Sequence, residues 1–93
     1  MMIGGKKARL DRDGAMAIAA QAIVFLAADE DRLARFLALT GLSPDELKGG
    51  LGQPALLGGV LDHLLGDEAL LLGFAQSAGI DPELPAAARR LLP

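Results

Sequence analysis

Hydrophobic residues recur along the chain at spacings of three and four, and this pattern predicts a series of short helices. The most apolar run, AMAIAAQAIVFLAA over Ala15–Ala28, is expected to form a buried helix that begins near Asp11 or Asp13. Leucine pairs four residues apart predict a second strongly apolar helix over Pro54–Leu65. The remaining helices are expected over residues 30–40, 44–48, 67–78 and 85–91.

Glycine, proline and acidic residues mark where these helices begin and end. Gly41 followed by Leu42 predicts a Schellman stop, and Gly79 followed by Ile80 predicts the same. The run Ser43–Glu46 has the pattern of a capping box with proline at the first helical position. Each of these junctions therefore combines a helix end, a glycine and a new helix start.

Identical residues at an offset of 38 positions indicate an internal duplication. The stretch FLALTGLSPDEL at Phe36–Leu47 returns in part as FAQSAGIDPEL at Phe74–Leu84. The identities at this offset are Leu26/Leu64, Asp29/Asp67, Glu30/Glu68, Leu33/Leu71, Phe36/Phe74, Gly41/Gly79 and Pro44/Pro82. We therefore expect an all-α, compact bundle of five or six short helices, built from two related helical units at about 15–47 and 53–85.

Composition agrees with a helical domain, and charge is divided unevenly along it. Hydrophobic residues make up 52% of the 93 residues but aromatic ones only 3%, so good helix formers, leucine and alanine, supply the core. We expect one domain over residues 11–93 behind a flexible basic tail over 1–10. Residues 1–14 hold four basic and two acidic residues, so the net charge of −3 leaves −5 on the rest. Such an acidic body disfavours general nucleic-acid binding.

The apolar run Ala15–Ala28 follows basic residues, as the core of a signal peptide would, and it is too short to span a bilayer. Asp11 and Asp13, however, stand where a signal sequence is purely basic. At the repeat offset the run also corresponds to an internal helix. We therefore expect a cytoplasmic protein without membrane contact, and the absence of cysteine suits a reducing compartment.

Residues able to carry out chemistry are sparse. His63 is the one histidine and lies near Asp62 and Asp67, but without a second histidine or a cysteine the set is incomplete for zinc. We expect an exposed His63–Asp67 pair on the helix surface instead. The glycines over 49–52 lack the lysine of a phosphate loop, and Ser43 has no adjacent base. We expect no catalytic residue, no cofactor, no metal and no enzyme activity.

The fourth helix offers a candidate interaction surface at Gly58, Gly59, Asp62 and His63. The two glycines fit either a relaxed surface or close helix crossing, or a groove where the backbone of a partner approaches. The high leucine content also predicts an apolar patch on the surface. We therefore expect a protein interaction module that binds itself or a helix of another protein, and its oligomeric state stays open.

An alternative function is regulatory nucleic-acid binding through the bend at Ala75–Ile80, whose Ala-x-x-x-Gly-Ile spacing is that of a helix-turn-helix. A recognition helix should follow with polar and basic side chains, but the next residues are DPELP over 81–85. Arg89 and Arg90 are then the candidate phosphate contacts. Nucleic acid is therefore the less favoured partner.

The stretches Val60–Glu83, VLDHLLGDEALLLGFAQSAGIDPE, and Phe36–Leu47 resemble a small family of short bacterial proteins known only as a domain of unknown function. The likeness covers the chain from about Ala15 to Leu92. It rests on a helix, an Asp-Glu pair, another helix and then Gly-[Leu/Ile]-[Ser/Asp]-Pro. The resemblance implies a compact helical protein of the bacterial cytoplasm, and it supplies no catalytic or binding residues.

Overall fold

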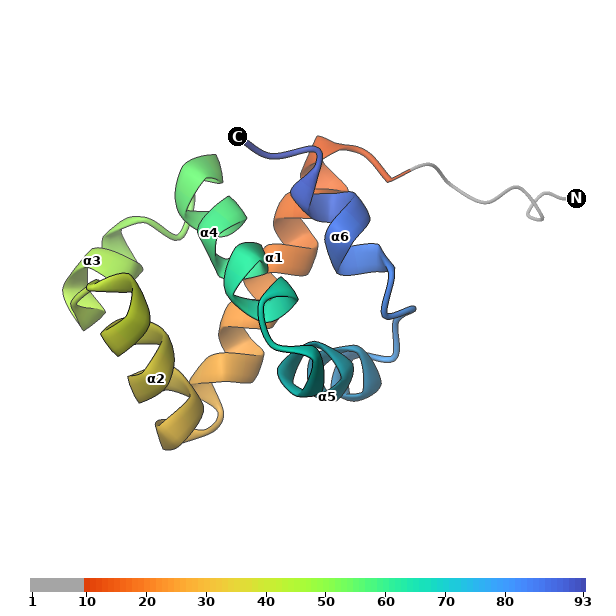
Figure 1. The fold of residues 1–93 in the computed structure, drawn as a ribbon. Coiled ribbons are helices and arrows are strands. Elements are labelled where there is room, and N and C mark those ends of the chain that lie inside the picture. The colour runs from red at the N-terminus through yellow and green to blue at the C-terminus, as the bar shows by residue number, and fades with distance from the viewer. Residues whose placement is uncertain (1–9) are drawn as a thin grey trace, which may run out of the picture.

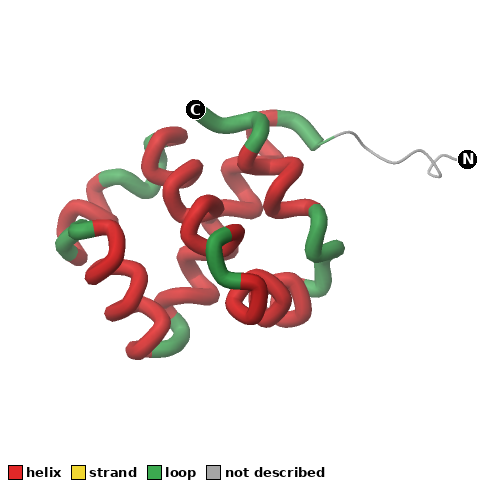
Figure 2. The backbone as a smooth tube through the Cα atoms, in the orientation of Figure 1, coloured by secondary structure: helices red, strands yellow, loops and turns green. Residues whose placement is uncertain are grey.

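The computed structural model describes residues 10–93, which form six helices joined by short turns (Figure 1). The helices are α1 (Arg12–Ala27), α2 (Glu30–Thr40), α3 (Pro44–Gly49), α4 (Pro54–Leu65), α5 (Glu68–Ala78) and α6 (Leu84–Arg89). Within residues 10–93 there is no strand (Figure 2). The expected all-α bundle is therefore confirmed. None of the six helices is both long and apolar enough to cross a bilayer.

Helix α1 is the centre of the molecule, because α2, α4, α5 and α6 all pack against it (Figure 1). The core is formed mainly by fully buried residues of α1 and α4, with one phenylalanine each from α2 and α5. Its largest side chains are Leu26, Phe36, Leu57, Leu61, Leu64 and Phe74. Leu10, which the sequence placed in the basic tail, packs partly buried against this core. The rest of the predicted tail lies outside the described residues.

The prediction that Ala15–Ala28 is a buried helix is only half correct. One side of α1 is buried through Ala15, Ile18, Ala19, Ala22, Phe25 and Leu26. The opposite side is exposed, although it carries almost no polar side chain. An apolar run without a polar stripe predicts burial all round, but the neighbouring helices cover one side only. Asp11 caps the helix by accepting a 2.7 Å hydrogen bond from the Gly14 amide.

Helices α2 and α5 are alike in length, start and end. Each has 11 residues, and each begins after an aspartate whose side chain accepts backbone amide hydrogen bonds. Each ends at a glycine in the left-handed region, with φ of 76° at Gly41 and 69° at Gly79. Phe36 and Phe74 are each 1% exposed. These matches agree with the 38-residue offset, and the duplication itself stays a prediction.

The two glycine stops differ in their hydrogen bonds. At Gly79 the expected Schellman pair forms, because Ile80 donates to Ala75 O at 3.0 Å and Gly79 to Gln76 O at 3.4 Å. At Gly41 the prediction is wrong, since a single bond runs from its amide to Leu37 O at 2.9 Å. The Leu42 amide donates instead to Thr40 Oγ1. A threonine at the end of α2 therefore replaces the second Schellman bond.

Candidate functional site

The residues of the interaction surface predicted on α4 have different surroundings and do not form one surface. A Cβ atom placed on Gly58 would lie 2.8 Å from Pro93 O and 3.2 Å from Arg89 Nη1, so this glycine is closely covered. The close backbone approach expected at Gly58 is thus made by this chain's own C-terminal segment. Gly59, one residue on, has nothing within 4 Å of such a Cβ and is exposed.

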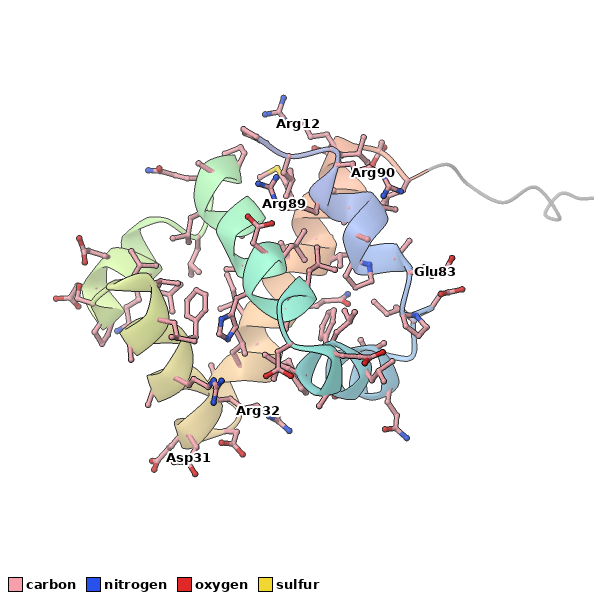
Figure 3. All side chains as sticks on the ribbon, in the orientation of Figure 1. Arg12, Asp31, Arg32, Glu83, Arg89 and Arg90 are labelled. Carbon is pink, nitrogen blue, oxygen red and sulfur yellow. The ribbon has the colours of Figure 1, made fainter. Side chains whose placement is uncertain are left out.

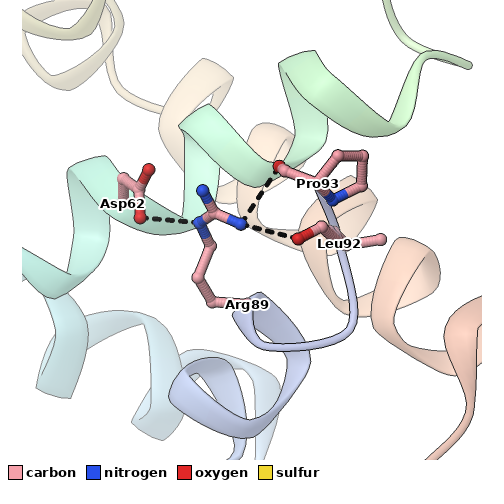
Figure 4. A network of polar contacts seen from close by, with 4 residues as sticks. All are labelled: Asp62, Arg89, Leu92 and Pro93. Carbon is pink, nitrogen blue, oxygen red and sulfur yellow. Dashed lines mark hydrogen bonds and ion pairs between the residues drawn. The ribbon is translucent and has the colours of Figure 1, made fainter.

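Asp62 belongs to the same contact between α4 and the C-terminal segment (Figure 4). Arg89 Nε donates to Asp62 Oδ1 at 2.7 Å, and Arg89 Nη1 donates to Leu92 O at 2.9 Å and Pro93 O at 3.1 Å. The hydrogen bond from Arg89 to Asp62 raises the pKa of the arginine. Arg89 therefore links residues 92–93 to α4, and we call these contacts the Arg89 clasp.

His63 points to the other side of α4, toward α2. Its ring meets the edge of Phe36 at 5.0 Å between centroids, and its Nε2 atom is buried without a hydrogen-bond partner among the described residues. The predicted exposed pair with Asp67 is wrong, because packing on Phe36 makes the ring half-buried. Burial and the nearby charge of Arg35 lower the pKa of His63, and the charge of Asp67 acts against this shift. Within residues 10–93 no three His, Asp or Glu side chains gather as metal ligands would.

The helix that follows the bend at Ala75–Ile80 has no free face with which to contact DNA bases. The following helix, α6, has six residues and packs between α1 and α4, with Pro85 and Ala88 buried. Arg89 lies on the side of α6 that faces α4, where the clasp occupies it, and Arg90 lies on the other side (Figure 3). A recognition helix enters the major groove with exposed polar side chains, and this geometry does not offer one.

The exposed side of α1 is an uncovered and uncharged helix surface, which we call the α1 face. Its members are Ala17, Ala20, Gln21, Val24, Ala27 and Ala28. Val24 is 68% exposed, the highest value among the large hydrophobic residues of the described chain. No member is charged, and Asp13 and Asp29 bound the face at its two ends. At 1.5 Å per residue the face is about 17 Å long.

A hollow of about 750 Å³ lies on one side of the α1 face, between α1 and α5. Phe25 of α1 and Phe74 of α5 both line it, with ring centroids 5.6 Å apart. Arg32 of α2 also lines this hollow (Figure 3). Its guanidinium carbon lies 4.1 Å from the centroid of the Phe25 ring. The cation of Arg32 thus packs on an aromatic ring.

A second hollow, of about 210 Å³, lies on the other side of the α1 face, between α1, α2 and α3. Its lining is apolar apart from one lysine and consists of Ile23, Ala27, Leu33, Leu37, Pro44, Leu47, Lys48 and Leu51. Leu51 is 45% exposed at its rim. An engineered apolar cavity of about 150 Å³ holds a benzene molecule, so this hollow has room for one apolar side chain.

The charged residues that line these two hollows are all basic, although the described chain is acidic. The sequence has 12 acidic and nine basic residues, and Lys6, Lys7 and Arg9 precede the described part. Acidic residues therefore outnumber basic ones by 12 to six from residue 10 on. The α5-side hollow nevertheless contains only Arg32, and the α3-side hollow only Lys48. Over residues 10–93 the single ion pair is Arg89–Asp62, so both cations remain unpaired.

The α1 face and its two hollows, rather than the predicted surface on α4, form the candidate site. No curated protein and no solved structure matches the chain. A family described as proteins of unknown function, DUF3572, matches residues 12–93, which include all six helices. The resemblance to a domain of unknown function is thereby confirmed, and the chain belongs to this DUF3572 family.

Proposed function

We propose that this protein is a non-enzymatic interaction module that binds a helix of a partner protein on its α1 face. The observation that carries the proposal is Val24, which is 68% exposed in the middle of an uncharged helix side. Exposed apolar patches that a polar rim surrounds are typical of protein interaction sites. The cysteine-free sequence supports a cytoplasmic setting for this role.

The shape of the α1 face supports a helical ligand. Alanines at positions 17, 20 and 27 let a second helix approach closely, since a small side chain keeps the two axes near each other. The hollows on either side can receive larger side chains from such a helix. Helix-in-groove recognition uses anchors at spacings of three and four, and the three turns of the α1 face match that arrangement.

The alternative of nucleic-acid binding receives no comparable support. Arg89 is engaged in the clasp, and α6 is packed on two sides. Arg90 alone is exposed near the bend. One free arginine supplies little of the phosphate neutralisation on which such binding depends.

A selection of displayed helical peptides against the purified protein tests the proposal. Val24→Glu places a charge at the centre of the α1 face, and glutamate itself favours the helical conformation. Leu39→Glu is the matched control, because Leu39 is 66% exposed on α2 and lines neither hollow of the α1 face. Circular dichroism verifies that both variants are folded. We expect selected peptides to bind the wild type and Leu39→Glu equally and to lose at least about tenfold on Val24→Glu.

Two outcomes would contradict the proposal. Peptides that lose affinity equally on both variants would show that the face has no special role. Light scattering over a dilution series covers the second case: a dimer that Val24→Glu dissociates would show that a second copy of this chain, and not a partner helix, occupies the face.

A further inference from the structure

We infer that the partner helix carries carboxylates on both flanks of its apolar stripe, recognised by Arg32 on one side and Lys48 on the other. This inference rests on the proposed function and names the chemistry of the partner. It starts from the contrast between an acidic chain and two hollows in which every charged lining residue is basic. Basic residues in the two hollows favour a partner that carries negative charge.

The two cations lie on opposite sides of the bound helix because of the geometry of α1. Successive residues of a helix turn by about 100°, so Gln21 and Phe25 lie to one side of Val24, and Ile23 and Ala27 to the other. The first pair lines the hollow that contains Arg32, and the second pair lines the hollow that contains Lys48. A helix lying along Val24 therefore has one cation on each flank.

Neither cation has a carboxylate partner within the described chain. The only ion pair there joins Arg89 and Asp62, so a ligand does not have to displace an internal ion pair. Asp13 and Asp29 flank the face along the chain, one at each end. Carboxylates of the partner are thus favoured along the sides of the face and disfavoured at its ends.

Another hollow of the described surface serves as a contrast. It lies between α4, α5 and α6, and its charged lining residues are Asp81, Glu83 and Arg90. This mixture of signs gives no preference for an acidic ligand. Arg90 is therefore a suitable site for a control substitution, because it is exposed and lies outside both hollows of the α1 face.

Two designed peptides of about 14 residues, long enough to cover the face at 1.5 Å per residue, test the inference. They share one stripe of leucine and alanine, and their flanking positions are all glutamate in one and all lysine in the other. Fluorescence anisotropy measures their affinities at low and high salt. We expect the glutamate peptide to bind about tenfold more tightly at low salt, and the difference to shrink at high salt because ions screen exposed charges.

Two variants locate the origin of the preference. Lys48→Glu should remove most of it, whereas Arg90→Glu, which changes the net charge equally, should leave it in place. Equal affinities of the two peptides, or equal effects of the two variants, would overturn the inference. If both peptides bind without preference and both lose affinity on Val24→Glu, the inference fails and the proposed function stands. If neither peptide shows binding that depends on Val24, both fail.

Discussion

His63 occupies a half-buried position between α4 and α2, where its charged form is disfavoured. The ring lies against Phe36, Arg35 is the nearby cation, and Asp67 is the nearby anion. Burial, the larger cause, and Arg35 place the pKa of the folded state below the ordinary value of 6.5. The unfolded chain therefore binds the proton more readily than the folded one.

His63 should make the folded protein less stable as the pH falls. The stability that neutral His63 contributes is complete above pH 6.5 and is lost as the pH falls through the lowered pKa. Urea unfolding of the wild type and of His63→Leu at pH 5 and pH 7 measures this effect. We expect the wild type to lose more stability on acidification than the variant. Parallel losses would show that His63 titrates alike in both states.

Gly58 and Gly59 are neighbours in sequence with opposite surroundings, and substitutions there should have opposite effects. Alanine at Gly59 meets open space, so we expect it to stabilise the protein by about 1 kcal/mol through helix propensity. Alanine at Gly58 would crowd Pro93 O at 2.8 Å, and we expect a net loss of about 1 kcal/mol. The denaturant midpoints of the two variants, compared with that of the wild type, measure these changes in stability. Stabilisation by both substitutions would mean that the C-terminal segment does not cover Gly58.

At the scale of elements, the Arg89 clasp fixes how α6 and the last residues lie against α4. The ion pair with Asp62 is partly exposed, so we expect Asp62→Ala to cost no more than about 1 kcal/mol. Arg89→Ala also leaves the carbonyls of Leu92 and Pro93 without their donor, and we expect about 1–2 kcal/mol.

Hydrogen exchange and urea unfolding together test this difference. Amides of α6 should exchange faster in Arg89→Ala than in the matched control Arg90→Ala, whose side chain is exposed. Equal exchange in the two variants would mean that packing alone holds α6 in place.

Local sequence signals predict where a helix begins and ends, but they do not predict which other helices pack against it. The range Pro54–Leu65 was predicted as the structure has it, and the capping box at Ser43–Glu46 forms with both of its hydrogen bonds. These features depend on residues a few positions apart. The environment of His63 depends instead on α2 lying against α4. A spacing of four residues could only pair it with Asp67 on its own surface.

At the scale of the whole molecule, the packing of the six helices leaves one side of α1 uncovered. The sequence could not reveal this, because alanine is compatible with both burial and exposure and Ala15–Ala28 contains no charged residue. Arg32 and Lys48 lie beside the face only because α2 packs against α1 and α3 lines the same hollow as residues of α1 and α2. The site is therefore a product of helix packing, and no motif in the chain marks it.

The most direct test of the α1 face as the binding surface is a titration of the ¹⁵N-labelled protein with a selected helical peptide, followed by amide chemical shifts. We expect the largest changes within Ala17–Ala28, with further changes at Arg32 and Lys48. Changes concentrated around Arg90 and the Ala75–Ile80 bend, with α1 unaffected, would contradict it.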